Sequence, residues 1–373
     1  MSVAFKKILL ISPQPWGTIH ISKHHYAVAL ANLGHEVYFL NPPVNKRKKI
    51  EVRNVLADKK LSVIDSGFRN SLFLRYKLRP LYDLFVRRWL KKILREIPPP
   101  DIVWCFETNI IRDLGIFKGK KIFHVVDPIN RRMVPAGKTA DLIICVSNRI
   151  LEQFKEVNVH KRFINHALSD IAIDRAGKLK LPVARSNERL QAGYVGNLTR
   201  QVIDVSVITN LIEKFPGIDF HFWGPGDTAS ILGGESSDLL QKIRSFSNVF
   251  LHEPVDSSEL IPAISGMDLF LLAYKPVNDL HDCSNSHKLL EYWATGKIVV
   301  STYIDQYNNK ESSYLLQMSA ENKNDVLPEI FENVVNKIEE WNNVEMMSKR
   351  RSFAMGLSYT KNANAILELL EKF

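Results

Sequence analysis

Short, continuous apolar runs recur along the chain and alternate with segments of helical periodicity. Runs of this kind are typical of strands that are buried on both faces of a parallel sheet. Between the first two runs, residues 21–34 have helical spacing and end at Gly34, a suitable helix C-terminal cap. The repeated strand–helix–strand order therefore predicts a doubly wound α/β fold. The runs are residues 6–12, 35–41, 101–106, 120–126 and 141–147, then 189–197, 220–226, 248–253, 268–274 and 297–302.

The two series of runs indicate two domains. A chain of 373 residues is too long for one ordinary core, and the polar, proline-containing segment 175–188 separates the two series. We expect an N-terminal Rossmann-like domain over residues 1–180 and a C-terminal one over 188–357, with a last helix (358–373) that packs back on the first. Ligands of open parallel sheets bind beyond the carboxyl ends of the strands, so we expect the site in a central cleft between two facing domains.

The composition, 45% apolar and 24% charged residues, is that of a soluble globular protein. No apolar run reaches the roughly 18 to 20 residues that span a bilayer. The apolar start of the chain lacks a small-residue cleavage site, so we interpret it as the first strand and not as a signal peptide. The three cysteines are widely spaced, which indicates a reducing compartment without a disulfide framework or a zinc site. We therefore expect a cytoplasmic protein.

The net charge of +10 is concentrated in one segment. Residues 46–95 contain 16 Lys or Arg and 4 Asp or Glu, which suggests an anionic partner for this region. Part of the segment has an apolar face and a basic face. One interpretation is a core helix with a solvated basic face, and the other is a surface that meets anionic lipid; no recognition motif supports nucleic acid. The apolar face comprises Leu81, Phe85, Trp89 and Ile93, and the basic face comprises Arg87, Lys91 and Arg95.

Residues 285–302, NSHKLLEYWATGKIVVST, combine a polar start, an apolar helical pattern and a β-branched strand. The free backbone N–H groups at a helix N-terminus attract phosphate, and Lys288 in the first turn would add a full positive charge. Glu291 lies one turn later on the same side, where its carboxylate could accept hydrogen bonds from a ribose diol. Together the two residues suit a nucleoside diphosphate. The alternative interpretation is a surface Lys–Glu pair on an amphipathic helix.

This segment resembles the donor-site helix of GT-B glycosyltransferases, in which a K-x-x-E-Y-x-A-x-G-K-x-V-V pattern is common. Further segments resemble other landmarks of the same family in the same order, and the likeness covers most of the chain. The family is the nucleotide-sugar-dependent type known as glycosyl transferases group 1. The segments are GHEVYFLNPP, ADLIICVSNRILEQF, LQAGYVGNLTRQVID, FHFWGPGD and NVFLHEPV.

The resemblance implies donor-binding roles for six residues. Glu291 would bind the ribose, Gly196 would permit close approach of the chain, and Arg200 would supply a second positive charge. Members with a retaining mechanism often carry two acids in an E-x7-E pattern, but Cys283 occupies the first of these positions, which puts retention in doubt. No D-x-D occurs in the chain, so we expect the helix dipole and lysine, without a metal or other cofactor, to neutralise the leaving diphosphate. The residues implied for the diphosphate itself are Ser286, His287 and Lys288.

The acceptor side is expected in the N-terminal domain. An inverting transfer needs a general base, and Asp127, just after the strand at 120–126, is the candidate, with His124 as the alternative. Another interpretation is that Asp127 only caps the segment before Pro128. The loop after the first strand should also line the site. Its candidate residues are Gly17, Thr18 and His20. We interpret His20, and likewise His24 and His25, as acceptor contacts or surface residues and not as metal ligands.

These observations predict a glycosyltransferase that moves a hexose or related sugar from a nucleotide-sugar donor to a hydroxyl acceptor. We expect the acceptor to be a saccharide, such as a lipid-linked saccharide of cell-surface polysaccharide assembly, with the enzyme peripheral on the inner face of the membrane. Alternatives are a GT-B-fold nucleotide-sugar epimerase and a non-catalytic sugar-nucleotide-binding protein. A dinucleotide-dependent dehydrogenase is disfavoured, because no G-x-G-x-x-G follows a strand.

Overall fold

The computed structural model describes residues 4–17, 20–45, 49–56, 60–181, 188–225, 238–275 and 285–372. The chain divides into two compact units, each with its own sheet and hydrophobic core. Unit 1 comprises Met1–Asn165 and Tyr359–Phe373, and unit 2 comprises His166–Ser358. The expected domain limits of 180 and 188 differ from this division, because residues 170–178 form a helix that packs on unit 2.

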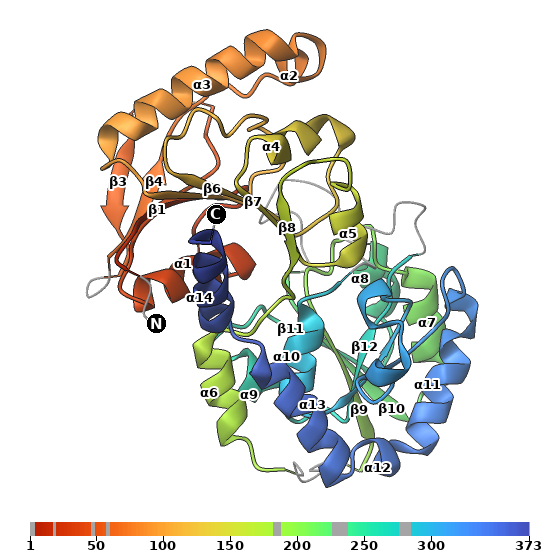
Figure 1. The fold of residues 1–373 in the computed structure, drawn as a ribbon. Coiled ribbons are helices and arrows are strands. Elements are labelled where there is room, and N and C mark those ends of the chain that lie inside the picture. The colour runs from red at the N-terminus through yellow and green to blue at the C-terminus, as the bar shows by residue number, and fades with distance from the viewer. Residues whose placement is uncertain are drawn as a thin grey trace. The chain divides into compact units, whose positions relative to one another are not determined.

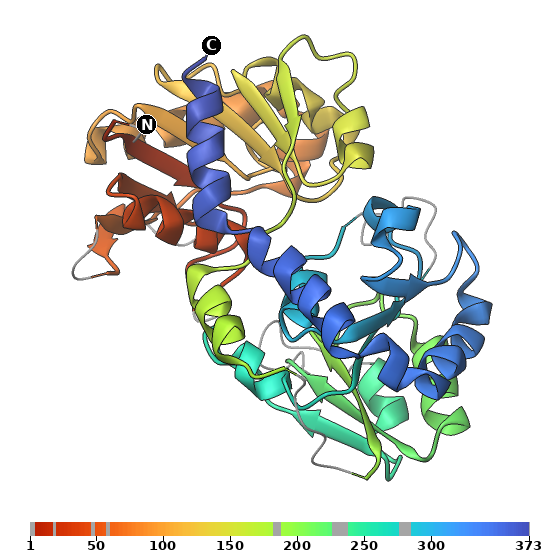
Figure 2. The same cartoon turned by 60° about the horizontal axis from the view of Figure 1, so that its bottom comes forward.

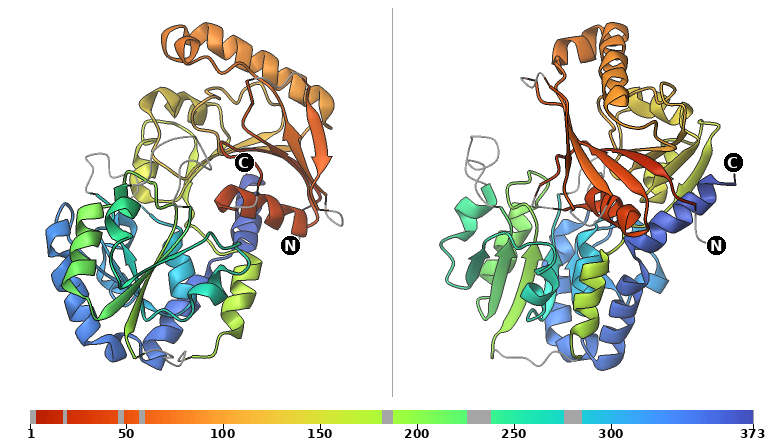
Figure 3. Two further views of the ribbon diagram at one scale, coloured as in Figure 1. Left: turned by 180° about the vertical axis from the view of Figure 1, so that it is seen from behind. Right: turned by 90° about the vertical axis from the view of Figure 1, so that its left-hand side faces the viewer.

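Unit 1 is built around an eight-stranded sheet of order β3-β4-β2-β1-β5-β6-β7-β8 (Figure 1). Among the strands that the structure describes here, β3 runs antiparallel to its neighbour β4 and the other pairs are parallel. Helices α1 and α14 cover one face and α3 covers the other (Figures 1 and 3). The elements are β1 Lys7–Ile11, α1 Ser22–Asn32, β2 Glu36–Leu40, β3 Glu51–Asn54, β4 Leu61–Asp65, α2 Leu72–Lys77, α3 Arg79–Glu96, β5 Ile102–Cys105, β6 Lys120–Val125, α4 Val134–Lys138, β7 Leu142–Cys145, α5 Asn148–Glu152, β8 His160–Phe163 and α14 Tyr359–Leu370.

Unit 2 has a six-stranded, entirely parallel sheet of order β11-β10-β9-β12-β13-β14. Helices α6, α9, α10 and α13 pack together on one face, and α7 and α11 pack together on the other (Figure 1). The elements are α6 Asp170–Lys178, β9 Leu190–Val195, α7 Val205–Lys214, β10 Ile218–Trp223, α8 Asp238–Ile243, β11 Val249–His252, α9 Leu260–Ile264, β12 Leu269–Leu272, α10 Lys288–Ala294, β13 Ile298–Ser301, β14 Leu316–Met318, α11 Leu327–Asn336, α12 Ile338–Trp341 and α13 Val344–Gly356.

The last helix, α14, packs beside α1 in unit 1 (Figure 2). The Tyr359 ring stacks on His25 with 5.2 Å between ring centroids and meets Tyr26 edge-on at 5.0 Å. The Asn362 amide donates to the Asn165 carbonyl at 3.0 Å. These contacts tie the end of the chain to the first helix of unit 1.

All ten apolar runs form strands, so the predicted α/β class is confirmed. Four further strands in the described part of the chain were not predicted from the sequence. β3 (EVRN) is fully exposed, and β8 (HKRF) lies at a sheet edge and alternates exposed with half-buried residues. β14 has only three residues, and β4 (LSVID) mixes polar with apolar residues. These strands lack a long apolar run, because part of their surface is not covered by neighbouring elements.

The apolar stripe predicted for the basic segment is wrong in part. Trp89 and Ile93 are buried, but Leu81 and Phe85 are 42% and 37% exposed, and the face that α3 buries includes Tyr82 and Val86 instead. A stripe of period four drifts by about 40° per step on a helix of 3.6 residues per turn, so its two ends cannot face the same core.

Candidate functional site

The strand order of unit 2 predicts where its ligand site lies. The order reverses between β9 and β12, and sheets of this type bind ligands beyond the carboxyl ends of the strands at that reversal. Gly196 directly follows β9, Tyr274 follows β12, and helix α10 begins at Lys288. The fold therefore brings three segments that are distant in sequence to one edge of the sheet.

Lys288 is buried between two tyrosines at this edge. Its Nζ atom donates a hydrogen bond to Tyr274 Oη at 2.7 Å and a longer one to Tyr194 Oη at 3.4 Å. The same atom lies 5.2 Å from the Tyr194 ring centroid and 5.3 Å from that of Tyr274, within range of a cation–π interaction. Burial alone lowers the pKa of Lys288, but the phenolic oxygens more than offset this effect, so the pKa is raised. The site therefore holds a fixed positive charge at neutral pH.

Gly196 leaves room for this ammonium group. Its φ of 148° favours glycine, and a Cβ atom there would come within 2.5 Å of Lys288 Nζ. Gly224, which follows β10 and has a φ of 140°, packs directly against the Gly196 backbone. A side chain at position 196 would therefore displace the lysine.

Glu291 lies one turn further along α10 and is partly buried. Burial raises the pKa of its carboxyl to about 7, although the Lys288 charge acts in the opposite direction. Within the part of the chain that the structure describes, this carboxylate makes no hydrogen bond or ion pair. A partly desolvated carboxylate with unused acceptor atoms is well suited to bind ligand hydroxyls. The alternative of a surface Lys–Glu pair is wrong, because Lys288 is buried and bonds to tyrosines.

The remaining residues implied for donor binding lie around the same edge. Ser286 is buried and its carbonyl accepts from the backbone of α10 at 3.3 Å, while His287 is the N-cap residue, so α10 begins at Lys288. The His287 ring lies 5.8 Å from that of His166. Arg200 is exposed, and its charge lowers the pKa of Lys288, which places it in the neighbourhood of the lysine.

Tyr194 and Tyr274 were missed by sequence reasoning. Tyr194 is the last residue but one of β9 and Tyr274 lies two residues after β12, and an aromatic residue near a strand end is more often a core residue than a ligand contact. Their role depends on the lysine that the fold brings between them. Cys283, the position that bears on stereochemistry, lies outside the described residues.

Unit 1 has its own strand-order reversal, between β1 and β5, and a buried lysine lies there. Lys23, in the first turn of α1, donates through Nζ to Gln14 Oε1 in the loop after β1. Burial lowers the pKa of Lys23 to about 8, while the charges of Asp127 and Glu107 raise it. Glu107, just after β5, is buried, and burial raises its pKa despite backbone hydrogen bonds from the following turn. Sequence reasoning missed Lys23, because a helical lysine usually points to solvent.

The two candidates for a general base differ in their surroundings. Asp127 is exposed in the loop after β6, close enough to Lys23 to affect its pKa. His124 is buried, accepts from Trp104 Nε1 through Nδ1 at 3.1 Å, and stacks on Phe106 with 4.5 Å between centroids. These surroundings are those of a core histidine, so Asp127 is the better placed of the two.

The other candidate acceptor residues that the structure describes lie in the loop before α1 and in its first turn. His24 accepts from the Ile21 amide through Nδ1 at 3.2 Å and contacts the Pro15 carbonyl through Nε2 at 3.0 Å. Burial lowers the pKa of His24 to about 4, and its ring stacks with His20 at 5.4 Å. Burial likewise lowers the pKa of His25 to about 3. Thr18 lies outside the described residues, and a Cβ at Gly17 would meet nothing within 4 Å.

Solved structures resemble nearly the whole chain. An Escherichia coli trehalose-6-phosphate structure bound with UDP-2-fluoro glucose has 9% sequence identity and a TM-score of 0.70, and covers 98% of this chain and 99% of its own. A sucrose-phosphate synthase from Thermosynechococcus elongatus has 12% identity and a TM-score of 0.70, with 98% coverage of both chains. WaaG, a glycosyltransferase involved in lipopolysaccharide biosynthesis, has 14% identity and a TM-score of 0.65, with 97% and 99% coverage. This chain has the GT-B fold.

The identities are low enough that the likeness establishes the GT-B fold alone. No protein-family model matches the sequence, and no curated protein matches it significantly. Among the described residues, no helix combines the length and apolarity that crossing a membrane requires. In the same part of the chain, no group of three His, Cys, Asp or Glu side chains is arranged to hold a metal ion.

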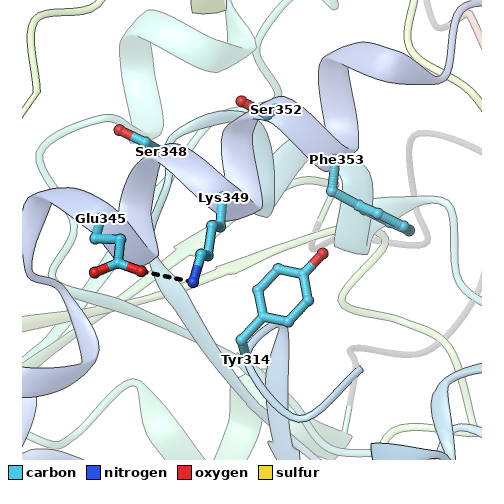
Figure 4. A pocket seen from close by; sticks show the side chains of 6 residues that line it. All are labelled: Tyr314, Glu345, Ser348, Lys349, Ser352 and Phe353. Atoms are coloured by element: carbon cyan, nitrogen blue, oxygen red, sulfur yellow. Dashed lines mark ion pairs between the residues drawn. The ribbon is translucent and has the colours of Figure 1, made fainter. Parts of the chain in front are cut away.

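Two surface hollows of this GT-B protein lie away from the candidate donor and acceptor residues. One, of about 730 Å³, opens on α13 of unit 2 between Tyr314 and Phe353 (Figure 4). Its Lys349 is paired with Glu345 at 2.6 Å, so its charge is already neutralised. The second hollow, of about 560 Å³, opens beside α3 of unit 1. Neither is lined by a candidate donor or acceptor residue.

Proposed function

We propose that the protein is a glycosyltransferase that moves a sugar from a nucleotide-sugar donor to a hydroxyl acceptor. The observation that carries the proposal is the Lys288 ammonium group, fixed by two tyrosines at the strand-order reversal of unit 2, with the Glu291 carboxylate one helical turn away. A fixed cation beside a hydroxyl acceptor matches the two polar parts of a nucleoside diphosphate. The names of the matched structures, which include a glycosyltransferase and a structure with a UDP-sugar analogue, support the same function.

In the proposed reaction, an acceptor oxygen attacks the anomeric carbon while the bond from that carbon to the diphosphate breaks. Asp127 accepts the proton of the attacking hydroxyl. Lys288 and Arg200 stabilise the negative charge that develops on the departing diphosphate, and Glu291 holds the ribose. Because the lysine supplies charge that a metal would otherwise provide, we propose that the transfer needs no metal ion.

We further propose that the acceptor is a lipid-linked saccharide and that the enzyme works at the inner surface of a membrane. The basic excess of residues 46–95 supports this choice. An epimerase is not favoured, because the matched structures that carry an enzyme name are of transferases or synthases. Release of free nucleoside diphosphate in the presence of an acceptor tests for transfer. A thermal-shift panel of nucleoside diphosphates would identify the base, since a bound ligand raises the melting temperature.

The titration of Glu291 gives a direct test of donor binding. Its pKa of about 7 means that the carboxylate is fully ionised only above neutral pH. We expect affinity for an intact nucleotide sugar, whose diphosphate does not titrate in this range, to rise severalfold between pH 6 and pH 8. Glu291→Gln should abolish this pH dependence of the affinity and weaken nucleotide-sugar binding roughly tenfold at pH 8. Calorimetry can measure both effects.

The same substitution should affect stability in the opposite sense. The folded-state pKa is raised above the unfolded value, so the folded protein binds more protons between about pH 4.5 and pH 7, and stability falls as pH rises through this window. Glu291→Gln should therefore raise the melting temperature at pH 8 relative to wild type. If Glu291→Gln loses stability at pH 8 but keeps the wild-type affinity for nucleotide sugar and its dependence on pH, Glu291 is a structural residue.

A further inference from the structure

Helices α2 and α3 carry a concentrated patch of exposed apolar side chains. Helix α3 buries one face in the core of unit 1, whereas α2 buries none of its side chains fully. Seven of the fourteen large apolar residues that are exposed in the described part of the chain lie within residues 72–85. Such clusters usually mark an interaction site. The patch consists chiefly of Leu72, Phe73 and Tyr76 on α2 and of Leu81, Leu84 and Phe85 on α3.

Positive charges flank this apolar patch. Residues 72–96 contain eight Lys or Arg and two acids. Arg88, Lys91 and Lys92 are exposed and form no ion pair within the described ranges of the chain. An apolar helix face beside uncompensated cations is the pattern of helices that lie in the interface of an anionic membrane.

The hollow beside α3 adds a third observation. Its volume is about 560 Å³, and its lining includes Leu84 of the patch, the cations of Arg87, Arg112 and Lys138, and the carboxylates of Asp83 and Asp113. Asp83 is paired with Arg79. Arg87 is paired with Asp113. Arg112 and Lys138 make no hydrogen bond or ion pair with other described residues. Two uncompensated cations at the rim of an apolar surface suit a phosphate group.

We propose that the α2–α3 face docks on an anionic phospholipid membrane. The apolar patch enters the boundary between headgroups and acyl chains, and the hollow takes a lipid phosphate. A second copy of this chain is a poorer occupant, because a two-fold contact would bring two strongly basic surfaces together. This proposal rests on the proposed function, which supplies the membrane-borne acceptor. It adds the surface of the protein that contacts the membrane.

Sedimentation of the full-length protein with vesicles tests the docking. We expect binding to vesicles of phosphatidylcholine mixed with phosphatidylglycerol, weakened by salt, and little binding to phosphatidylcholine alone. Each basic residue near such a surface contributes roughly fivefold in partition, so changing Arg88, Lys91 and Lys92 to Glu should lower binding on the order of 100-fold. A matched control changes three exposed lysines of unit 2 to Glu and should bind almost as wild type. The control positions are Lys310, Lys323 and Lys337.

Two further variants separate the parts of the surface. Leu72→Ser with Phe73→Ser should lower vesicle binding about tenfold, whereas Phe250→Ser with Leu251→Ser, two exposed apolar positions on β11 of unit 2, should not. Arg112→Gln with Lys138→Gln should reduce the preference for phosphatidylglycerol severalfold. Circular dichroism confirms that each variant is folded.

Several results would overturn the docking proposal. They are equal binding to neutral and anionic vesicles, binding that survives the α3 charge reversal, losses of equal size in the control variants, and a dimer that the α2 substitutions dissociate. Transfer to a soluble acceptor is measured on the same samples. Vesicle binding without any nucleotide-sugar binding or transfer would refute the proposed function and leave the docking intact, and the reverse result would refute only the docking.

Discussion

Asp127→Asn should lower kcat by roughly 10² to 10⁴ while nucleotide-sugar affinity stays within about twofold of wild type. The carboxylate is exposed after β6 and lies near the buried Lys23 ammonium, whereas donor binding is assigned to the other unit. Asparagine keeps the shape of the side chain and its ability to cap the following segment, but it cannot accept a proton at neutral pH. Turnover of nucleotide sugar measures kcat, and calorimetry measures affinity.

His124→Phe is the matched control for this prediction. Phenylalanine preserves the aromatic stacking of His124 and removes its ring nitrogens, including the one that accepts the hydrogen bond from Trp104. We expect kcat to fall by less than about tenfold. If Asp127→Asn keeps most of its turnover and His124→Phe loses it, the base is His124 and the assignment to Asp127 is wrong.

Lys23 should influence the same reaction through its charge. Its pKa of about 8 means that the ammonium form, which attracts the Asp127 carboxylate, is lost as pH rises through 8. We therefore expect the wild-type rate to decline above that pH. Lys23→Met should lower the maximal rate about tenfold and remove the decline of the rate above pH 8. An unchanged pH profile in this variant would restrict Lys23 to a structural role.

The sequence was most informative where a buried strand needs apolar residues on both faces. Strands such as β1 and β13 could be predicted from KILLI and IVVS alone, because any polar residue there would lie in the core. The edge strand β3 has no such requirement, and its polar sequence EVRN gives no signal. The burial of Leu81 and Phe85 on α3 was predicted wrongly for a related reason. The spacing of apolar residues predicts a helix, but it does not show which of them a neighbouring element covers.

The candidate site was predictable only in part. Lys288 and Glu291 could be identified because a lysine and an acid one turn apart at the start of a helix suit a diphosphate and a sugar. The environments of these two residues could not be predicted, because the burial of Lys288 depends on Tyr194 and Tyr274, which are 94 and 14 residues away in the chain. The same limitation hid Lys23, whose pKa depends on Glu107 and Asp127. Long-range packing, and not local pattern, determines which charges are held in place.

Lys288→Met should weaken nucleotide-sugar binding by roughly 10- to 100-fold, because a charge-assisted contact to the diphosphate is worth about 1.5 to 3 kcal/mol. The structure adds that the variant should also lose stability. Methionine fills much of the space but leaves the hydroxyls of Tyr194 and Tyr274 without the ammonium donor that they now share. We expect the free energy of unfolding to fall by about 1 to 3 kcal/mol, measured by denaturant titration.

Lys297→Met separates the two effects of the Lys288 substitution. Lys297 is also buried, but it lies just after the opposite end of α10, at the amino end of β13. Its replacement should lower stability without changing affinity for the nucleotide sugar. Tyr274→Phe should give an intermediate result, since it removes the 2.7 Å hydrogen bond that positions the ammonium but keeps the charge. If Lys288→Met and Lys297→Met lose stability alike and both bind the donor as wild type does, Lys288 holds the two tyrosines together and the diphosphate is bound elsewhere.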